Sequence, residues 1–98
     1  MGITGPLRRE AAETGALTML AWLAGEDDLF AAFMGATGAS PDDIAVRATD
    51  PVFLGAVVTF VLSEDAYVLA WADATGQPPD LASRIMAGLP GGEAWHWT

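Results

Sequence analysis

The second half of this sequence matches the first when one is laid over the other. The alignment lays residues 25–43 (GEDDLFAAFMGATGASPDD) over residues 63–81 (SEDAYVLAWADATGQPPDL). The aligned pairs that are identical are Glu26/Glu64, Asp27/Asp65, Ala32/Ala70, Ala36/Ala74, Thr37/Thr75, Gly38/Gly76, Pro41/Pro79 and Asp42/Asp80. A repeat of this length is typical of a repeated supersecondary unit. We therefore expect two tandem copies of one unit, spanning roughly 7–48 and 51–88, and a tail at 89–98.

Each unit is predicted to contain a helix, a second helix and a short third helix. Gly25 and Ser63 stand where the N-caps of the second helices are expected, because acidic residues follow each of them and the helix dipole favours anions in a first turn. Gly38 and Gly76 can take the left-handed conformation that ends a helix. The second helix of each unit is thus predicted between these residues.

Prolines mark the other helix starts. Ser40-Pro41 provides an N-cap and a first-position proline, and Pro79-Asp80 is expected to have the same part in the second unit. Asp50-Pro51 is predicted to begin the first helix of the second unit, whose counterpart in the first unit spans roughly residues 7–24.

The most apolar segment, residues 52–62 (VFLGAVVTFVL), is interpreted as a central helix. Its β-branched residues alone would also fit a strand. The repeat favours a helix, because the aligned residues 19–23 (MLAWL) are good helix formers. A helix that is apolar all round belongs at the centre of a bundle. The sequence therefore predicts an all-α fold, a compact bundle of about six helices built from two tandem three-helix repeats, in a single domain over residues 1–98.

Composition and charge restrict the classes of partner that we expect. A chain of 98 residues that is 52% hydrophobic has apolar surface that a second copy is expected to cover, which favours a homodimer. The net charge of −9 repels phosphate backbones and anionic membrane surfaces, so we expect neither nucleic acid nor a membrane as a partner. The chain has no Cys, and its first residues lack an apolar signal core, so a cytoplasmic location is expected.

The titratable residues predict no catalytic, cofactor or metal site. The acidic clusters at 26–28, 42–43 and 64–65 fall in predicted first turns, where the helix dipole explains them. His96 is the single histidine, which leaves no zinc site of the ordinary type, and no G-x-S-x-G motif accompanies it. We expect a protein without enzymatic activity, cofactor or metal.

The tail carries the candidate partner-binding residues Trp95, His96 and Trp97. Residues 89–92 (LPGG) stop the last helix, and two tryptophans follow where most chains end in polar residues. The indoles either dock onto the same molecule as a structural latch or insert into a partner as an aromatic anchor. Both interpretations stay open at this point.

Three segments resemble a known family. Residues 16–28 (ALTMLAWLAGEDD), 50–58 (DPVFLGAVV) and 90–98 (PGGEAWHWT) are similar to the short alphaproteobacterial proteins grouped as domain of unknown function 3572. The resemblance covers nearly the whole chain, and the closing segment is its most specific part. It implies no activity, cofactor or site residue, because the family has none assigned.

Two hypotheses about function follow. The first is a helical protein-interaction or regulatory domain without catalytic activity, which binds a protein partner, or a second copy of itself, through an apolar groove between the units or through the aromatic tail. The alternative is a small apolar-ligand binding protein with a pocket between the two repeat units, lined by Phe, Trp and Met side chains.

Overall fold

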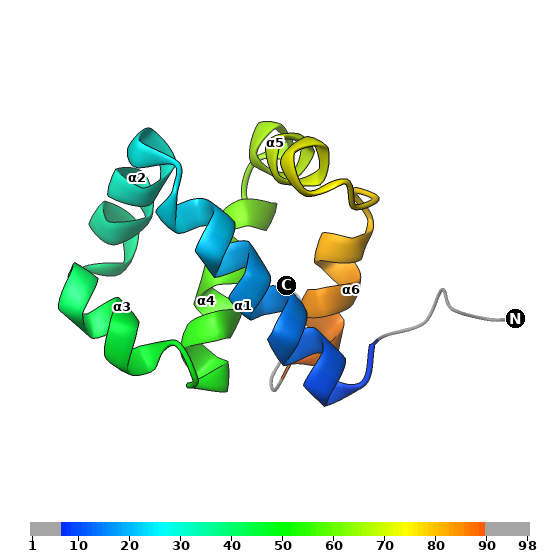
Figure 1. The fold of residues 1–98 in the computed structure, drawn as a ribbon, viewed down its shortest axis with the longest axis horizontal. Coiled ribbons are helices and arrows are strands. Elements are labelled where there is room, and N and C mark those ends of the chain that lie inside the picture. Colours follow the sequence, from blue (N-terminus) through cyan, green and yellow to red (C-terminus); the bar gives the residue numbers. More distant parts are fainter. Residues whose placement is uncertain (1–6, 90–98) are drawn as a thin grey trace, which may run out of the picture.

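The computed structural model of the chain describes residues 7–89. This part of the chain contains six helices and no strand. The helices are α1 (Arg9–Ala24), α2 (Asp27–Thr37), α3 (Pro41–Arg47), α4 (Pro51–Leu62), α5 (Asp65–Thr75) and α6 (Leu81–Gly88) (Figure 1). The prediction of an all-α bundle of about six helices is confirmed. The first helix begins at Arg9, slightly later than the pattern indicated.

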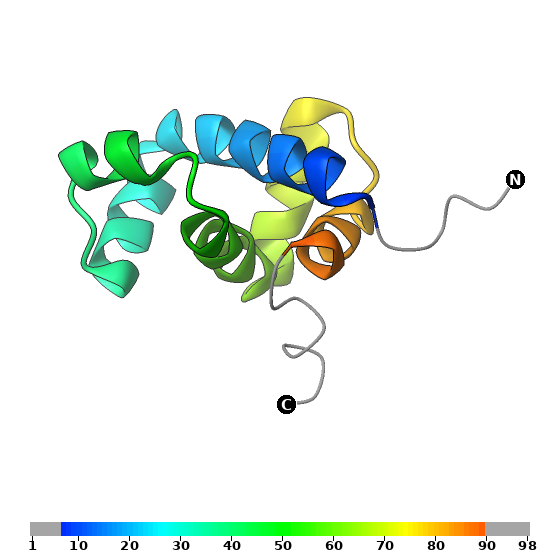
Figure 2. The same ribbon diagram turned by 90° about the horizontal axis from the view of Figure 1, so that it is seen from below.

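Helices α1 and α4 cross at the centre of the molecule, with α2 and α3 at one end and α5 and α6 at the other (Figure 1). Viewed from below, α1 lies across α4 and α6 (Figure 2). These three helices pack against one another, and α5 packs on α4. The large side chains that are fully buried between the helices are Trp71, Phe33, Met19, Leu23, Ile85, Val57, Val58 and Val61.

Helix α4 is central, as its apolar sequence predicted. It contributes six buried residues, namely Phe53, Leu54, Gly55, Val57, Val58 and Val61. Among residues 7–89 no single helix combines the length and the apolar composition needed to cross a bilayer; α4 and α5 reach both only as a pair, which is bent by 106°.

Several predicted helix boundaries are confirmed by their cap geometry. Gly38 and Gly76 have φ of 74° and 70°, the left-handed conformation expected after α2 and α5. Ser40 Oγ accepts a hydrogen bond from the Asp43 amide at 3.2 Å, and Asp43 Oδ2 accepts one from the Ser40 amide at 3.1 Å. Asp50 Oδ1 accepts a hydrogen bond from the amide of residue 52 at 3.0 Å, which caps α4.

The prediction that Gly25 and Ser63 are N-caps is wrong. Both residues are C-caps of the preceding helices, and Glu26 and Glu64 are the N-caps of α2 and α5. The Ser63 hydroxyl donates to the Phe60 carbonyl at 2.6 Å, so it already serves the end of α4. Gly25 and Ser63 therefore end one helix each, and the next helix begins one residue later than predicted.

Helix α6 begins later than its counterpart α3. It starts at Leu81, and its N-cap Asp80 makes no capping hydrogen bond with its side chain. Pro78 stands where Ser40 stands in the first half, so the hydroxyl that caps α3 is missing. The Pro78 carbonyl instead accepts from the Leu81 amide at 3.1 Å, which forms a turn before the helix.

Candidate ligand-binding pocket

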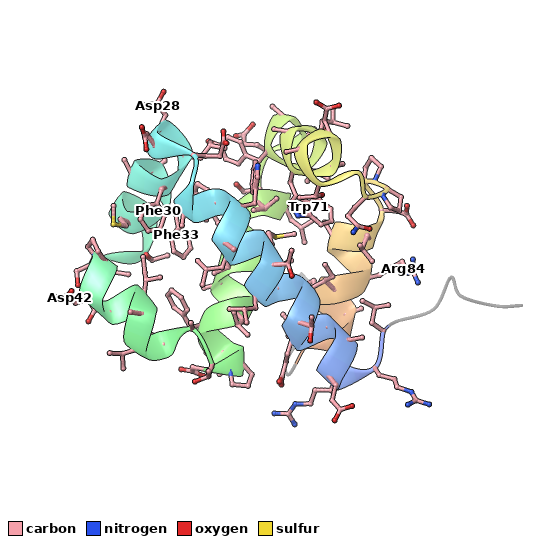
Figure 3. The ribbon with its side chains drawn as sticks, viewed as in Figure 1. Asp28, Phe30, Phe33, Asp42, Trp71 and Arg84 are labelled. Carbon is pink, nitrogen blue, oxygen red and sulfur yellow. The ribbon has the colours of Figure 1, made fainter. Side chains whose placement is uncertain are left out.

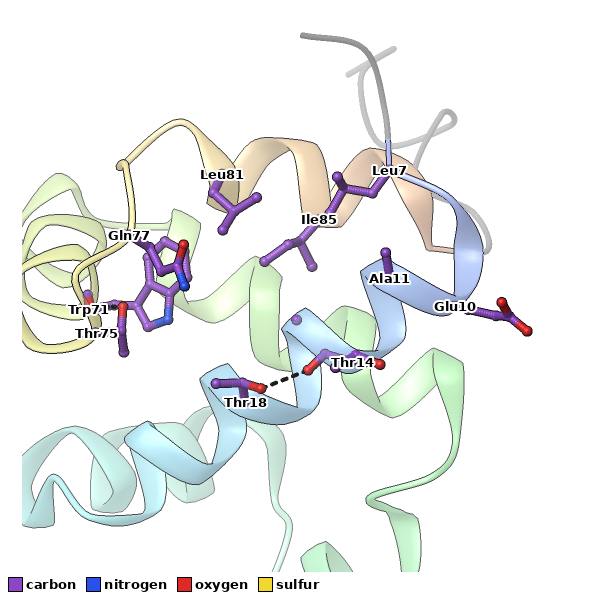
Figure 4. A pocket seen from close by; sticks show the side chains of 11 residues that line it. Leu7, Glu10, Ala11, Thr14, Thr18, Trp71, Thr75, Gln77, Leu81 and Ile85 are labelled. Carbon is purple, nitrogen blue, oxygen red and sulfur yellow. Dashed lines mark hydrogen bonds between the residues drawn. The ribbon is translucent and has the colours of Figure 1, made fainter. Parts of the chain in front are cut away.

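A pocket of about 430 Å³ opens between α1, α5 and α6 (Figure 4). We call it the α1–α5–α6 pocket. Its wall is formed by Leu7, Glu10, Ala11, Thr14, Gly15, Thr18, Trp71, Thr75, Gln77, Leu81 and Ile85. Ile85 and Trp71 are buried and make the floor, whereas the residues from α1 are half-buried or exposed and make the rim.

The pocket wall follows from helical spacing. Leu7, Ala11, Thr14 and Thr18 lie at intervals of three and four residues along α1 and the residues before it, so they share one face. Trp71 and Thr75 are one turn apart on α5, and Leu81 and Ile85 are one turn apart on α6. Each helix therefore presents one short stripe to the same space.

Two of the three threonines in the pocket wall direct their hydroxyl hydrogens at backbone carbonyls. The Thr18 hydroxyl donates to the Thr14 carbonyl at 2.9 Å, and the Thr75 hydroxyl donates to the Trp71 carbonyl at 2.7 Å. These side chains keep lone pairs that can accept a hydrogen bond. They have no free hydrogen to donate into the pocket.

Gly15 brings α1 close to α6 beside the pocket. A Cβ atom at this position would lie 2.9 Å from Ile85 Cδ1 and 3.0 Å from Ile85 Cγ1. A side chain here would therefore push against Ile85, and a large one would occupy the space that the pocket now leaves open.

The Trp71 side chain carries a buried donor without a partner. Its exposed fraction is 2%, and no group of residues 7–89 accepts a hydrogen bond from Nε1. In Figure 4 the indole nitrogen faces the space between α1 and α6. Buried polar groups are nearly always paired in proteins, so this nitrogen is an unusual group at the pocket.

The corresponding aromatic position in the first half is packed differently. Phe33, which the repeat aligns with Trp71, meets Phe53 at a ring-centroid distance of 5.9 Å and Phe60 at 5.4 Å, both edge to face. Phe53 also lies under Arg47, whose Cζ is 4.9 Å from the ring centroid. A second hollow of about 450 Å³ lies nearby between α2 and α4, lined by Ala36, Thr37, Ala56, Thr59, Phe60 and Ser63.

The acidic clusters singled out in the sequence, at 26–28, 42–43 and 64–65, do not line the pocket. Trp95, His96 and Trp97 lie outside the residues that the structure describes, so their role stays a prediction. The acidic clusters occupy helix caps and first turns, as predicted. Figure 3 shows Asp28 and Asp42 pointing outward, whereas Phe33 and Trp71 point inward. Within residues 7–89 no three His, Cys, Asp or Glu side chains are grouped so that they could hold a metal ion.

Sequence reasoning identified neither Trp71 nor Gly15 as a pocket residue. The signal was present in the repeat, because the alignment of the two halves lays Gly15 over Phe53 and Phe33 over Trp71. When a glycine in one half aligns with a large aromatic residue in the other, we expect a side chain to fill the space in one half and to leave it open in the other.

A family model described as a protein of unknown function (DUF3572) matches residues 9–92. No curated protein and no solved structure matches the chain.

Proposed function

Since the chain belongs to the DUF3572 family, whose description assigns no activity, we propose a function from the geometry: it binds a small, predominantly apolar molecule in the α1–α5–α6 pocket. The observation that carries this proposal is the open space beside Gly15, between the buried side chains of Ile85 and Trp71. Its volume of about 430 Å³ falls within the range of small-molecule sites.

The chemistry of the wall supports an apolar ligand. Leu7, Ala11, Leu81 and Ile85 offer hydrocarbon surface, and the hydroxyls of Thr18 and Thr75 are bonded to the backbone. Removing apolar surface from water is worth about 25 cal/mol per Å², so a ligand gains affinity by covering these side chains.

We also propose that the two halves are tandem three-helix units and that the pocket lies at the seam between them. Helices α2 and α5 begin and end at residues that the repeat aligns, Asp27 with Asp65 and Thr37 with Thr75. Buried positions also correspond in α1 and α4, in the pairs Ala16/Leu54, Met19/Val57, Leu20/Val58 and Leu23/Val61. Helix α1 belongs to the first unit, and α5 and α6 belong to the second.

The proposed role is binding without catalysis. Among the described residues that line the pocket, Glu10 alone is charged, which leaves it no second acid or base for proton transfer. We propose a cytoplasmic location for the protein, on the grounds of composition given above.

A protein partner, including a second copy of the chain, is the second candidate. Four large apolar side chains are exposed in the described part, namely Leu17, Val46, Val52 and Leu69. They lie on four different helices. Four exposed side chains offer a small apolar area, so they support this candidate less than the pocket supports a ligand. Sedimentation velocity over a range of protein concentrations tests the homodimer.

The test of ligand binding uses n-butylbenzene as the probe. We expect saturable chemical-shift changes in the amide spectrum of the full chain, concentrated at Ala11, Gly15 and Thr75. Ala11→Phe places a ring in the α1–α5–α6 pocket from an exposed helix position, so it should abolish these changes.

Ala36→Phe is the matched control. Ala36 is also exposed on a helix, and it lines the hollow between α2 and α4. This variant should bind n-butylbenzene as the unmodified chain does. Loss of binding in Ala36→Phe alone, or no saturable change in the unmodified chain, would refute the proposal.

A further inference from the structure

Among residues 7–89, the wall of the α1–α5–α6 pocket has one buried side-chain donor without an acceptor. This donor is Trp71 Nε1. The hydroxyls of Thr18 and Thr75 donate to carbonyls of their own helices, and the hydroxyl of Thr14 is on an exposed residue at the rim. Gln77 can donate from its amide, but it is exposed and stands at the rim. Of the donors along this wall, the indole N–H is therefore the one that is buried and has no acceptor within residues 7–89.

The charge of the site argues against an anionic ligand. Of the lining residues, Glu10 is the charged one, and no Arg is among them. The protein as a whole carries a net charge of −9. A carboxylate or phosphate entering this pocket would lose water without gaining a cation, which is strongly unfavourable. An oxygen atom of a neutral molecule costs far less free energy to remove from water than an oxygen of an anion.

The two halves of the chain differ at the aromatic position concerned. Phe33 fills its site with hydrocarbon alone and contacts Phe53 and Phe60 edge to face. Trp71 stands at the aligned position with an additional N–H, and it lines the same pocket as Gly15, which the repeat aligns with Phe53. The open space and the unused donor thus occur together, on the same side of the molecule.

We propose that the ligand of the α1–α5–α6 pocket is a neutral, mainly apolar molecule that carries a carbonyl or ether oxygen, and that this oxygen accepts a hydrogen bond from Trp71 Nε1. The inference rests on the proposed function and adds the class of ligand. The nitrogen is closed off from water, so flexible side chains of the wall move aside to admit the oxygen. The bond then forms in a dry environment, where it discriminates strongly between ligands with and without an acceptor.

Three matched probes test the inference with the full chain. Butyrophenone and n-butylbenzene differ in one group, a carbonyl in place of a methylene, and 4-phenylbutanoate supplies an anion of similar size. The Trp71 indole resonance, assigned by its loss in Trp71→Phe, should move downfield with butyrophenone and much less with n-butylbenzene. 4-Phenylbutanoate should bind at least about tenfold more weakly than butyrophenone at neutral pH.

Dissociation constants complete the test. Trp71→Phe should weaken butyrophenone about fivefold more than it weakens n-butylbenzene, as expected for the loss of one hydrogen bond. The comparison of two probes cancels the effect of the smaller ring on packing. The indole resonance can also be assigned on the unmodified chain, through its connection to the backbone resonances of Trp71. The indole shift therefore decides the question even when Trp71→Phe fails to fold.

The outcomes separate the two proposals. When n-butylbenzene and butyrophenone both bind in the pocket, but the indole resonance responds equally to both or Trp71→Phe weakens both equally, the ligand class is wrong and the pocket stands. Binding of 4-phenylbutanoate as tight as that of butyrophenone also overturns the neutral class. When neither neutral probe binds, the proposed function itself fails.

Discussion

The two halves of this protein handle one aromatic position in opposite ways. In the first half, Phe33 is enclosed by Phe53 and Phe60, and the cation of Arg47 covers Phe53. In the second half, Trp71 lines an open pocket together with Gly15 of α1, and its N–H has no acceptor among residues 7–89. Both aromatic side chains are buried, with exposed fractions of 0% and 2%, so burial alone does not distinguish them.

The difference goes together with a change of residue between positions that the proposed repeat aligns. The alignment of the two halves lays Gly15 over Phe53 and Arg47 over Ile85. Arg47 lies over the Phe53 ring at 4.9 Å, and Ile85 lies directly beside Gly15. The aligned residues Arg47 and Ile85 thus have corresponding neighbours, but only Arg47 lies against a large ring, that of Phe53. The pocket occupies the side from which the ring is missing.

The largest expected effect comes from removing the Phe53 ring, which packs against Phe33 of the first half. Phe53→Ala deletes a side chain that is 2% exposed, together with its contacts to Phe33 and Arg47. We expect the free energy of unfolding to fall by about 3–5 kcal/mol, the usual cost of emptying a buried phenylalanine site. Urea denaturation followed by circular dichroism measures this loss.

Val52→Ala is the control for this experiment, because Val52 is 70% exposed on the same helix, and its replacement should change stability by less than about 0.5 kcal/mol. Phe53→Ala should also create an apolar space beside Phe33, and such spaces bind small aromatic molecules. A loss below about 1 kcal/mol would mean that the site collapses around Phe33 and that the two halves differ less than the contacts indicate.

A smaller effect is expected at the two glycines between α1 and α6. A Cβ at Gly88 would lie 2.7 Å from the Leu7 carbonyl oxygen and 2.8 Å from Ala12 Cβ. The backbone must move to relieve this contact, so Gly88→Ala should cost about 1–3 kcal/mol. A Cβ at Gly15 meets only the flexible end of Ile85, so Gly15→Ala should cost less.

Paired urea titrations of Gly15→Ala and Gly88→Ala measure this difference. Gly15→Ala also replaces a glycine inside a helix, which favours the helix by up to about 1 kcal/mol and offsets part of the clash. Equal destabilisation by the two substitutions would contradict the view that α6 packs on α1 through a rigid contact at one end and an adaptable one at the pocket.

Most of the fold could be predicted from local signals. Local residues determine the caps at Ser40 and Asp50 and the left-handed conformation of Gly38 and Gly76. These features could therefore be predicted from a few neighbouring residues. The predicted start of the second helices was wrong. At Ser63 the hydroxyl could bond to the end of α4 or to the start of α5, and it donates to the Phe60 carbonyl of α4. Such a competition has no signature in residue type.

The pocket could not be predicted in the same way. It depends on which helices pack together, because Gly15 and Trp71 lie far apart in the sequence and meet only when α1 lies beside α5 and α6. Sequence reasoning placed a possible pocket between the units and expected Phe, Trp and Met to line it. One tryptophan does, while the rest of the wall consists mainly of Leu, Ile, Ala and Thr side chains.

The smallest expected effect distinguishes the starts of α3 and α6. In α3, hydrogen bonds from the Ser40 amide and then from its hydroxyl hold the pKa of Asp43 below its ordinary value of 3.8, with a further contribution from Arg47. A lowered pKa means that the carboxylate stabilises the fold above its ordinary pKa and that this stabilisation is lost as the pH falls through the lower, folded-state value. The stability difference between the unmodified chain and Asp43→Asn should therefore shrink in acid.

Nuclear magnetic resonance titration of the Asp43 carboxyl measures the cause directly. Ser40→Ala removes the hydroxyl and keeps the amide, so the pKa of Asp43 should rise part of the way towards 3.8. Loss of this cap should also lower the free energy of unfolding by about 1 kcal/mol at neutral pH. Helix α6 has Pro78 at the corresponding position and already lacks that hydroxyl. An unchanged Asp43 titration in Ser40→Ala would mean that the Ser40 hydroxyl does not lower this pKa and that the starts of α3 and α6 are closer in energy than their hydrogen bonds indicate.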